Sequence, residues 1–509
     1  MTENPAAIRR YDIVIIGGGI AGIAIAELLA RKSAWRIKVL EQADKLGEGA
    51  SGKLEGWFHT GALYSGSEDA QTFLNCVNAL EDLVELYSHY FTRVCNFGLQ
   101  ERRPGVWTPT VIPQEDAWFT ARPVQYILPR EDSPDIKLSR LKSEAVLWNL
   151  QKQRMLARME AVFAGRHNWQ VAGRYHAPDP DFIEKSTEIT GALLEPNAEL
   201  EEMCARYDRS CGVEPSRYDF LQSSDVPMNP IRIMRDLVAS ALAHGVEFET
   251  GAQVEAFGAG NRRIGRLESV RYRDREGAPV HLRADLFICA VGSGFEQLAP
   301  LLKVRPDVRV HKSYTLVAYP ALTELNFARM SPNARYHFNH LHVVATGSRG
   351  PIRYSMLADS GYQAGRAETP EFVNCTDLLL ELAQRYFGKE ALYRRLLHVY
   401  ECKKTEFIGD AEEERRYSYW IECDAARRCI SVLPGKFSFF PTVAWQTYKK
   451  VKELLNPQDS SDASMPRYDS SLQVKTAAAE LVADHYPYRF LSKHAADPEH
   501  LQNRETERW

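Results

Sequence analysis

Three glycines near the amino terminus have the spacing of a dinucleotide-binding loop. Gly17, Gly19 and Gly22 fit the pattern G-x-G-x-x-G directly after the apolar run Tyr11–Ile16. In such a loop the first glycine permits a tight turn and the second lets the backbone approach a pyrophosphate. The third lets the following helix pack on the strand. The spacing therefore predicts a strand, a phosphate-binding turn and a helix.

The predicted helix and the strand after it indicate which dinucleotide binds. The helix begins with Ile20 and Ala21, and the partial positive charge of its amino terminus attracts phosphate. The run Trp35–Leu40 predicts a second strand that delivers Glu41 and Gln42, with Glu41 nineteen positions after the third glycine. A carboxylate there accepts hydrogen bonds from ribose hydroxyls and repels a 2′-phosphate, so FAD or NAD is favoured over NADP.

A second glycine-rich segment, Gly47–Tyr64, separates FAD from NAD. Its glycines allow close backbone approach to an extended cofactor, and a serine hydroxyl can bond to phosphate or ribitol. Here the sequence resembles the D-amino-acid-oxidase-like flavoprotein superfamily, especially its 2-hydroxyglutarate and glycerol-3-phosphate dehydrogenase branches. The residues that match its G-A-S-G-x-x-x-G-x-x-H-x-G segment are Gly49, Ala50, Ser51, Gly52, Gly56, His59 and Gly61. The resemblance implies that the segment runs along the pyrophosphate of FAD and reaches the flavin ring.

At two places in this segment the contacts known for the family are not carried over directly. Lys53, Leu54 and Glu55 replace the more usual Arg-Asn-Ser filling, so contacts are not carried over at these positions. A histidine placed like His59 bonds covalently to the flavin in some dimethylglycine-dehydrogenase-like relatives. Covalent attachment and noncovalent packing of His59 near the ring are both open, and packing is favoured.

The adenine end of FAD is predicted to meet a strand in the middle of the chain. A helix that starts at Pro230 is followed by two runs that predict strands, Val246–Glu249 and Gln253–Phe257. The resemblance implies that the backbone around Val254 holds the adenine.

A third segment is predicted to pass beneath the cofactor. Arg266–Arg273 and Val280–Leu282 predict a strand pair, and a further buried strand is predicted from Ala284. The resemblance implies that this last strand ends in the cofactor-contacting residues Ala290 and Gly292.

The segment Val432–Ala444 is predicted to approach the flavin ring. It leads into a helix extending to about Leu455, and the resemblance implies that this helix points its amino terminus at the flavin pyrimidine. The helix dipole and backbone N–H groups would stabilise the negative charge of the reduced ring. The residues involved would be Gly435, Lys436, Phe437 and Ser438.

The sequence gives fewer signals for the residues that bind the substrate than for those that bind the cofactor. Hydride transfer needs a C–H bond held against flavin N5, a base for the adjoining proton, and an anchor for the substrate. Arg335 and Arg353 are candidate anchors, because the planar guanidinium matches a carboxylate. A surface ion pair explains each arginine equally well.

Three histidines and one tyrosine are further candidates for the substrate side. His337, His340 and His342 would not share one strand face, so a metal site is not expected. We take His342 as the candidate base, with ordinary strand histidines as the alternative. Tyr314 is predicted to line the pocket if its strand face looks inward.

These segments predict an α/β protein with a Rossmann-like FAD-binding domain and an interlocked α+β substrate domain. Because one hydrophobic core rarely organises more than about 300 residues, a chain of 509 residues is expected to form two domains. The FAD-binding domain is predicted from 1–95, 218–300 and 425–455, the substrate or cap domain from 96–217 and 301–424, and a linker and C-terminal arm from 456–509.

Composition excludes several other classes of protein. The formal net charge is −4 and no basic cluster is evident, so a nucleic-acid partner is not expected. The nine cysteines form no C-x-x-C pair, which favours reduced thiols and a cytoplasmic location. The apolar run Ile13–Ala30 is interrupted by glycines and contains Glu27, so neither a signal peptide nor a membrane span is expected.

The sequence therefore predicts an FAD-dependent oxidoreductase, a dehydrogenase or oxidase. Its expected substrate is a small polar molecule (2-hydroxy acid, amine or amino acid), which would give hydride to flavin N5. The electron acceptor is unknown, with oxygen and quinone both possible. Two alternatives remain, a flavin monooxygenase that uses NAD(P)H and oxygen, and a non-catalytic flavin-binding scaffold protein.

Overall fold

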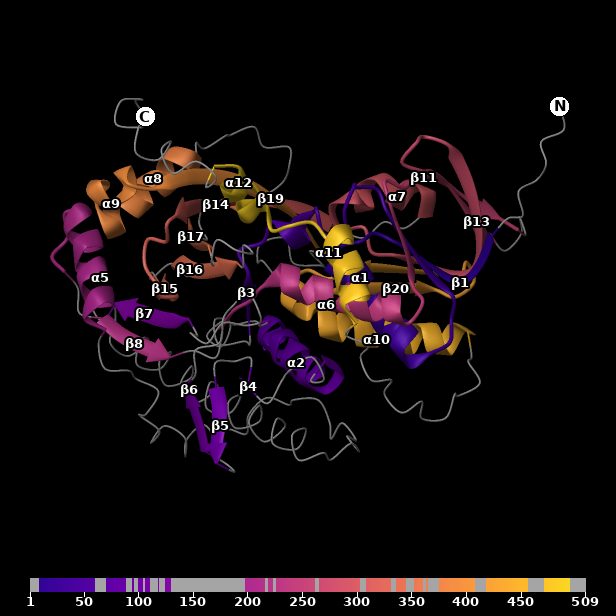
Figure 1. The fold of residues 1–509 in the computed structure, drawn as a ribbon, viewed down its shortest axis with the longest axis horizontal. Helices are drawn as coiled ribbons and strands as arrows, with labels where there is room; N and C mark the ends of the chain where they lie inside the picture. Colours follow the sequence, from indigo (N-terminus) through magenta and orange to yellow (C-terminus); the bar gives the residue numbers. More distant parts are fainter. Residues whose placement is uncertain are drawn as a thin grey trace. The chain divides into compact units, whose positions relative to one another are not determined.

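In the computed structural model, the chain folds into two compact units (Figure 1). The first comprises Met1–Lys53, Pro230–Val310 and Lys403–Asp484, and the second comprises Leu54–Asn229, His311–Cys402 and His485–Trp509. Relative to the predicted domains, residues 54–95 and 218–229 fall in the second unit, and residues 301–310 and 403–424 fall in the first. The residues that the structure describes are 9–59, 70–87, 94–95, 99–103, 106–109, 118, 124–129, 197–215, 218–222, 226–260, 265–302, 308–330, 336–344, 352–359, 363–364, 375–407, 418–455 and 471–494.

The sheet of the first unit has a parallel centre. The parallel strands lie in the order β10-β2-β1-β13-β21. Their bounds are β1 Arg9–Ile16, β2 Ile37–Glu41, β10 Glu247–Thr250, β13 Pro279–Cys289 and β21 Cys429–Leu433. The central strands β1, β2 and β21 are rich in Val, Ile and Leu, as strands covered on both faces require, and the predicted α/β fold class is confirmed.

Antiparallel strands complete this sheet. They are β11 Gln253–Ala259, β12 Leu267–Arg273 and β20 Trp420–Asp424. β13 pairs with β12 along its first half and with β21 along its second half. The two strands predicted at 280–282 and from 284 onward are therefore one strand, because Arg283 pairs with both Arg10 and Ser269 and so keeps the ladder unbroken.

Helix α1 (Ile20–Lys32) packs against α6 (Pro230–Ala243) and α10 (Phe440–Leu455). Glu27, the charge that interrupts the apolar run, is fully buried in α1. Its Oε1 accepts hydrogen bonds from Arg31 Nε at 2.6 Å and from Ser240 Oγ at 2.9 Å. The buried carboxylate is therefore paired and fastens α1 to α6. The remaining helices of the first unit are α7 Phe295–Leu302 and α11 Leu472–Leu481.

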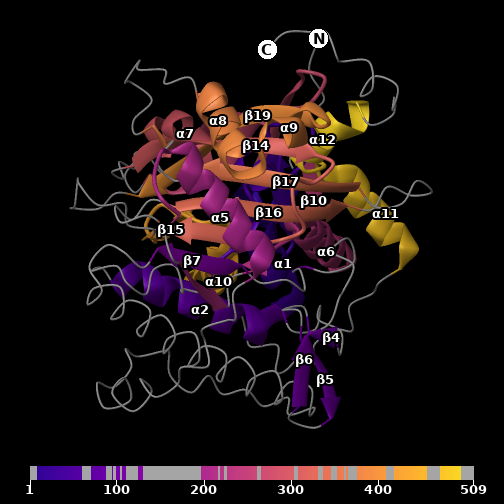
Figure 2. The ribbon, with the colours of Figure 1, turned by 90° about the vertical axis from the view of Figure 1, so that its left-hand side faces the viewer.

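The second unit is built on a mixed sheet in the order β18-β14-β17-β16-β15-β7-β8, with β19 paired to β14. The bounds are β7 Gln125–Pro129, β8 Tyr218–Gln222, β14 Val308–Tyr319, β15 Phe327–Met330, β16 Tyr336–Val344, β17 Ile352–Asp359, β18 Gln363–Ala364 and β19 Leu396–Phe407. One face is covered by α5 (Ala198–Ser210) and α8 (Cys375–Phe387), with the short α9 (Lys389–Tyr393) beside them, as Figure 2 shows. The core on this face includes Leu316, Leu357, Leu379 and Tyr386.

The opposite face of this sheet carries different neighbours. Val317, Tyr354 and Met356 form a second buried cluster with Leu491 of α12 (Tyr486–His494). The smaller elements of the unit are α2 Ala70–Tyr87, the pair β3 Trp57–Phe58 and β9 Val226–Pro227, and the three-stranded sheet β4 Val94–Cys95, β5 Leu99–Arg103 and β6 Val106–Pro109.

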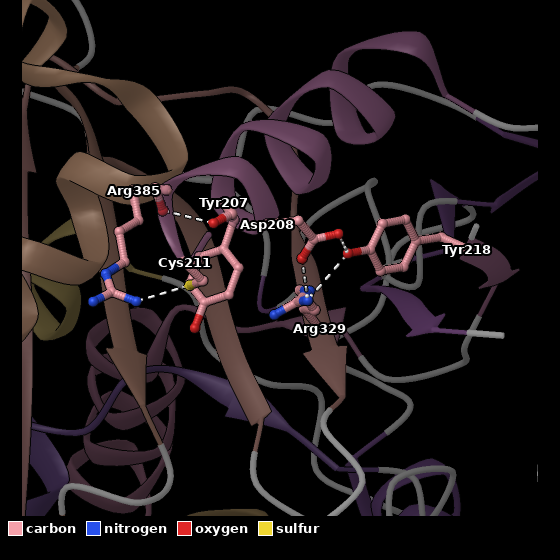
Figure 3. Close-up of polar contacts among 7 residues, drawn as sticks. Tyr207, Asp208, Cys211, Tyr218, Arg329 and Arg385 are labelled. Atoms are coloured by element: carbon pink, nitrogen blue, oxygen red, sulfur yellow. Dashed lines mark hydrogen bonds and ion pairs between the residues drawn. The ribbon is translucent and has the colours of Figure 1, made fainter. Parts of the chain in front are cut away.

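A buried ion pair fastens α5 to the sheet. Arg329 of β15 contacts Asp208 of α5 at 2.9 Å, and the same guanidinium nitrogen donates to the hydroxyl of Tyr218 at 3.1 Å (Figure 3). The Tyr218 hydroxyl also bonds to Asp208. The Arg329 guanidinium lies 4.3 Å from the ring centroid of Tyr207. The charges of Arg329 and Asp208 compensate one another and the Tyr218 hydroxyl bonds to both, so the role of this network is structural. Arg329 Nε has no hydrogen-bond partner among the described residues.

Candidate functional site

Four of the predicted cofactor segments leave the first sheet at the same edge. In the register of the parallel strands, Ile16 lies opposite both Leu40 and Cys289, and Cys289 lies opposite Ser431. The chain therefore emerges side by side as Gly17, Glu41, Ala290 and, after two more residues of β21, Pro434. Ligands of open α/β sheets bind outside the carboxyl ends of the strands, so this edge is the candidate cofactor site.

The glycines of the first loop are required by close backbone contacts. Gly17 has φ +107°, and a Cβ there would lie 2.3 Å from the carbonyl oxygen of Ala290. A Cβ on Gly22 would lie 1.9 Å from the carbonyl oxygen of Gly17. A Cβ on Gly19 would meet only Ser51 Oγ, at 3.3 Å. Gly17 and Gly22 therefore allow the turn and the packing, and Gly19 leaves the backbone open to a ligand.

Glu41 lies at the end of β2, where the ribose of a dinucleotide is expected. Its carboxylate accepts hydrogen bonds from the N–H groups of Gly18 at 2.6 Å and Ala43 at 2.9 Å. Burial raises the pKa of this carboxyl, and the two N–H groups oppose that shift. The N–H of Ala252 donates to the carbonyl of Glu41 at 2.8 Å, so the chain entering β11, with Val254, starts at this end of β2. Gln42 follows as an exposed residue.

The glycine-rich segment after β2 is tied to the start of α1. Residues Ala50–Gly52 form a short 3-10 helix, and Ser51 Oγ accepts a hydrogen bond from the N–H of Ile20 at 3.0 Å. The N–H of Gly47 donates to the carbonyl of Gly18 at 2.9 Å. The structure thus brings the second predicted segment to the first. Gly61 lies outside the described residues.

The segment after β21 contains a buried hydroxyl with no partner. Gly435 has φ +67°, and a Cβ there would lie 2.2 Å from the carbonyl oxygen of Ser418. A 3-10 turn, Phe437–Phe439, leads directly into α10. Ser438 is 1% exposed, and its Oγ has no hydrogen-bond partner among the described residues. A buried polar atom without a partner fits a ligand that supplies one, as the predicted flavin would.

The second unit contains the continuation of the glycine-rich segment towards His59. Among the described residues, the nearest rings around Trp57 have centroid distances of 4.5 Å to His59, 5.0 Å to His340 and 5.3 Å to Phe338. His59 is 8% exposed and His340 is fully buried. The segment thus reaches the face of the second sheet opposite α5 and α8, and it brings two histidines against one indole.

Sequence reasoning did not select His340 or Glu55 as site residues. The ring of His340 lies against Trp57, and Ser313 Oγ of β14 donates to the Glu55 carboxylate at 3.3 Å. The signals in the sequence were the middle histidine of the 337–342 group and the departure from the family filling at 53–55. Only the pairing of strands shows which histidine faces the segment.

The other predicted substrate residues have different surroundings. The Tyr314 hydroxyl donates to Glu401 at 2.9 Å, and its ring packs with the helix-covered core. Arg353 makes an ion pair with Glu324 at 2.5 Å, with both side chains about half exposed. His342 occupies the register position opposite Tyr354 on β17. Arg335 lies outside the described residues.

Comparison with known proteins agrees with this arrangement. Residues 12–407 match the family model described as DAO, FAD dependent oxidoreductase. The chain belongs to this family. A DAO-family chain is an FAD-dependent oxidoreductase, which confirms the predicted family, cofactor and enzyme class. No curated protein matches the sequence.

Solved structures of the DAO fold extend over most of this chain. Glycine oxidase from Geobacillus kaustophilus matches with a TM-score of 0.53 and 14% identity, covering 87% of this chain and 95% of its own. L-Proline dehydrogenase from P. horikoshii has a TM-score of 0.51 and 15% identity, with 96% and 99% covered. Iminodiacetate oxidase from Chelativorans sp. BNC1 has a TM-score of 0.51 and 12% identity, with 90% and 98% covered. At these identities the likeness concerns the fold.

None of the helices in the described ranges is long and apolar enough to cross a membrane. Among the same residues, no group of three His, Cys, Asp or Glu side chains is placed to hold a metal ion.

Proposed function

We propose that this DAO-family enzyme oxidises a small polar substrate, a 2-hydroxy acid, an amine or an amino acid, by hydride transfer to flavin N5. The observation that carries the proposal is the convergence of four loops at the carboxyl edge of β2, β1, β13 and β21. A cofactor with adenosine at one end and a redox ring at the other needs such separate contacts along its length.

Each loop has a proposed part in binding FAD. The first loop and Ser51 hold the pyrophosphate, and the residues after β2 and in β11 hold the adenosine. The segment after β13 passes beneath the cofactor, and the segment after β21 faces the pyrimidine. The proposed set is Gly17, Gly19, Ile20, Ala21, Gly22, Glu41, Gln42, Gly49, Ala50, Ser51, Gly52, His59, Gly61, Val254, Ala290, Gly292, Gly435, Lys436, Phe437 and Ser438. When bound, the flavin supplies the two-electron acceptor for the reaction.

The substrate is proposed to meet residues of the second unit. Trp57 and His59 form one wall, and His340 with the Ser313–Glu55 pair supplies polar groups beside it. Imidazoles in such a position can accept the proton of the substrate hydroxyl or amine. Arg335 and His342 stay in the proposal as anchor and base, whereas the exposed ion pair of Arg353 and the helix-side packing of Tyr314 argue against a contact with substrate.

Anaerobic reduction of the purified yellow protein tests the proposal. The substrate panel contains 2-hydroxyglutarate and glycerol 3-phosphate, named by the family branches, and glycine, L-proline and iminodiacetate, named by the structural neighbours. We expect at least one compound to bleach the visible absorbance of the flavin. Reduction by NADPH alone would indicate a monooxygenase, and no reduction by any compound would indicate a non-catalytic flavoprotein.

The electron acceptor is tested separately. Once the flavin has been reduced, it is mixed with oxygenated buffer or with a soluble quinone under nitrogen, and the return of absorbance is timed. Fast return with oxygen identifies an oxidase, and fast return with the quinone alone identifies a dehydrogenase.

A further inference from the structure

His485, which directly precedes α12, is buried in the interior of the second unit. It is 4% exposed, and both ring nitrogens have partners. Nδ1 lies 2.8 Å from the hydroxyl of Tyr354, and Nε2 lies 2.9 Å from the carbonyl oxygen of Leu54. Tyr354 is itself fully buried on β17.

These partners define the protonation state of the ring. Burial raises the pKa of Tyr354, so its hydroxyl keeps its proton and donates it to Nδ1. Nε2 must then carry the ring proton and donate it to Leu54, because a carbonyl oxygen only accepts. Burial lowers the pKa of His485 to about 4, so the imidazole is neutral at physiological pH. His485 is therefore a fixed donor to Leu54, with its orientation set by Tyr354.

The segment that His485 holds is the one that leads to His59. Three successive carbonyls are held by other parts of the second unit: Leu54 by His485 Nε2, Glu55 by His340 Nδ1 at 3.4 Å, and Gly56 by the N–H of Met228 at 2.7 Å. Trp57 follows directly and packs on His59. A backbone fixed at consecutive carbonyls has little freedom, so the positions of the Trp57 and His59 rings depend on these bonds.

The helix after His485 packs in the second unit through contacts of its own. Phe490 of α12 stacks on His398 with ring centroids 3.9 Å apart, and Tyr486 lies 5.0 Å from Tyr400. Leu491 is fully buried in the cluster that contains Tyr354.

We propose that His485 is a positioning residue of the active site, which acts from the C-terminal arm by fixing segment Leu54–His59 in the shape that presents Trp57 and His59 to the flavin. This inference rests on the proposed function, because the flavin contact of the segment belongs to that proposal. The sequence predicts the segment that contains His485 only as a C-terminal arm after a linker. The inference gives this segment a role in the active site.

Three variants of the full-length, FAD-saturated protein test the role. His485→Leu removes both hydrogen bonds, and His485→Gln keeps an amide N–H that can donate to Leu54. Phe490→Leu is the matched control, because it loosens the packing of α12 and leaves both bonds of His485 in place. The measurements are the visible circular dichroism of bound FAD and hydrogen exchange across residues 54–59, with the unfolding temperature recorded for each variant.

We expect His485→Leu to change the flavin dichroism and to speed exchange in residues 54–59 at least tenfold, with His485→Gln recovering most of both. Phe490→Leu should lower the unfolding temperature without either effect. The inference is overturned if His485→Leu and Phe490→Leu give the same dichroism and the same exchange at equal FAD occupancy. An unaltered protein that takes up no FAD would instead overturn the proposed function, and the inference with it.

Discussion

At the residue scale, Gly22 shows why one position of the first loop accepts only glycine. A Cβ on Gly22 would sit 1.9 Å from the carbonyl oxygen of Gly17, and that atom belongs to backbone that cannot rotate away. In a loop without this contact, replacing the glycine would cause no steric overlap. The constraint thus comes from the helix lying directly on the loop.

Gly22→Ala is expected to lower FAD affinity at least tenfold, since the loop must shift to relieve the overlap, and overpacking costs roughly 1–3 kcal/mol. Fluorescence titration of the apoprotein with FAD measures the change. Gly212→Ala serves as the control, because this glycine of the second unit has φ +73°, so the substitution strains the backbone, and a Cβ there would meet nothing within 4 Å. Equal affinities for the two variants would contradict the assignment of the first loop to the cofactor.

His485 gives a residue-scale prediction about pH. Its pKa is lowered to about 4 in the folded protein from 6.5, so the unfolded chain binds the proton more tightly. The stability associated with the neutral ring is complete above about pH 6.5 and is lost as the pH falls towards 4, by roughly 3 kcal/mol in total.

Denaturant unfolding at about pH 7.5 and about pH 4.5 should therefore show a smaller loss of stability for His485→Leu than for the unaltered protein. The variant is less stable at the higher pH, and the two curves approach one another at the lower pH. Parallel losses would show that His485 does not titrate in this window.

At the element scale, α5 is joined to the second sheet by one buried ion pair. The side chains of Arg329 and Asp208 are 12% and 5% exposed, so each charge depends on the other for compensation. The stacked rings of Tyr207 and Tyr386, 4.7 Å apart, add apolar contact around the pair.

Arg329→Met is expected to destabilise the protein by about 3–5 kcal/mol, because it leaves Asp208 buried without its cation. The double variant Arg329→Met with Asp208→Leu should recover part of that loss, since no charge is then left uncompensated. Thermal and denaturant unfolding of the unaltered protein, the two single variants Arg329→Met and Asp208→Leu, and the double variant completes the cycle. A double variant that is as unstable as the sum of the two single variants would contradict the pairing.

At the scale of the whole molecule, the C-terminal segment contributes to both compact units. In the first unit, Leu46 pairs with Val482, and the N–H of Ala483 donates to the carbonyl of Leu46 at 2.9 Å. In the second unit, His485 bonds to Leu54. The two bonded residues, Leu46 and Leu54, flank residues 47–53, the first part of the glycine-rich segment of the proposed FAD site.

Deletion of residues 471–509 is therefore expected to weaken FAD retention at least tenfold in addition to lowering the unfolding temperature. Gel filtration followed by the ratio of flavin to protein absorbance measures retention. If the truncated protein keeps its FAD as firmly as the intact one, the segment has no part in the cofactor site.

The sequence by itself determined the cofactor half of this protein. The run Tyr11–Ile16, the three glycines and Glu41 predict a strand, turn, helix and acid from local spacing alone, and the family match and the fold bear out the cofactor and the α/β class. Local patterns are enough to predict these elements, because the hydrophobic periodicity of a strand or a helix can be read from consecutive residues.

Only the tertiary structure decided the substrate half. Strand pairing puts the ring of His340 against Trp57, packs Tyr314 with the helix-side core and leaves Arg353 in an exposed ion pair. A strand has two faces, and its sequence does not state which face meets a partner that comes from hundreds of residues away. His485 and Leu54 are 431 positions apart, so their bond arises from long-range packing that no local pattern encodes.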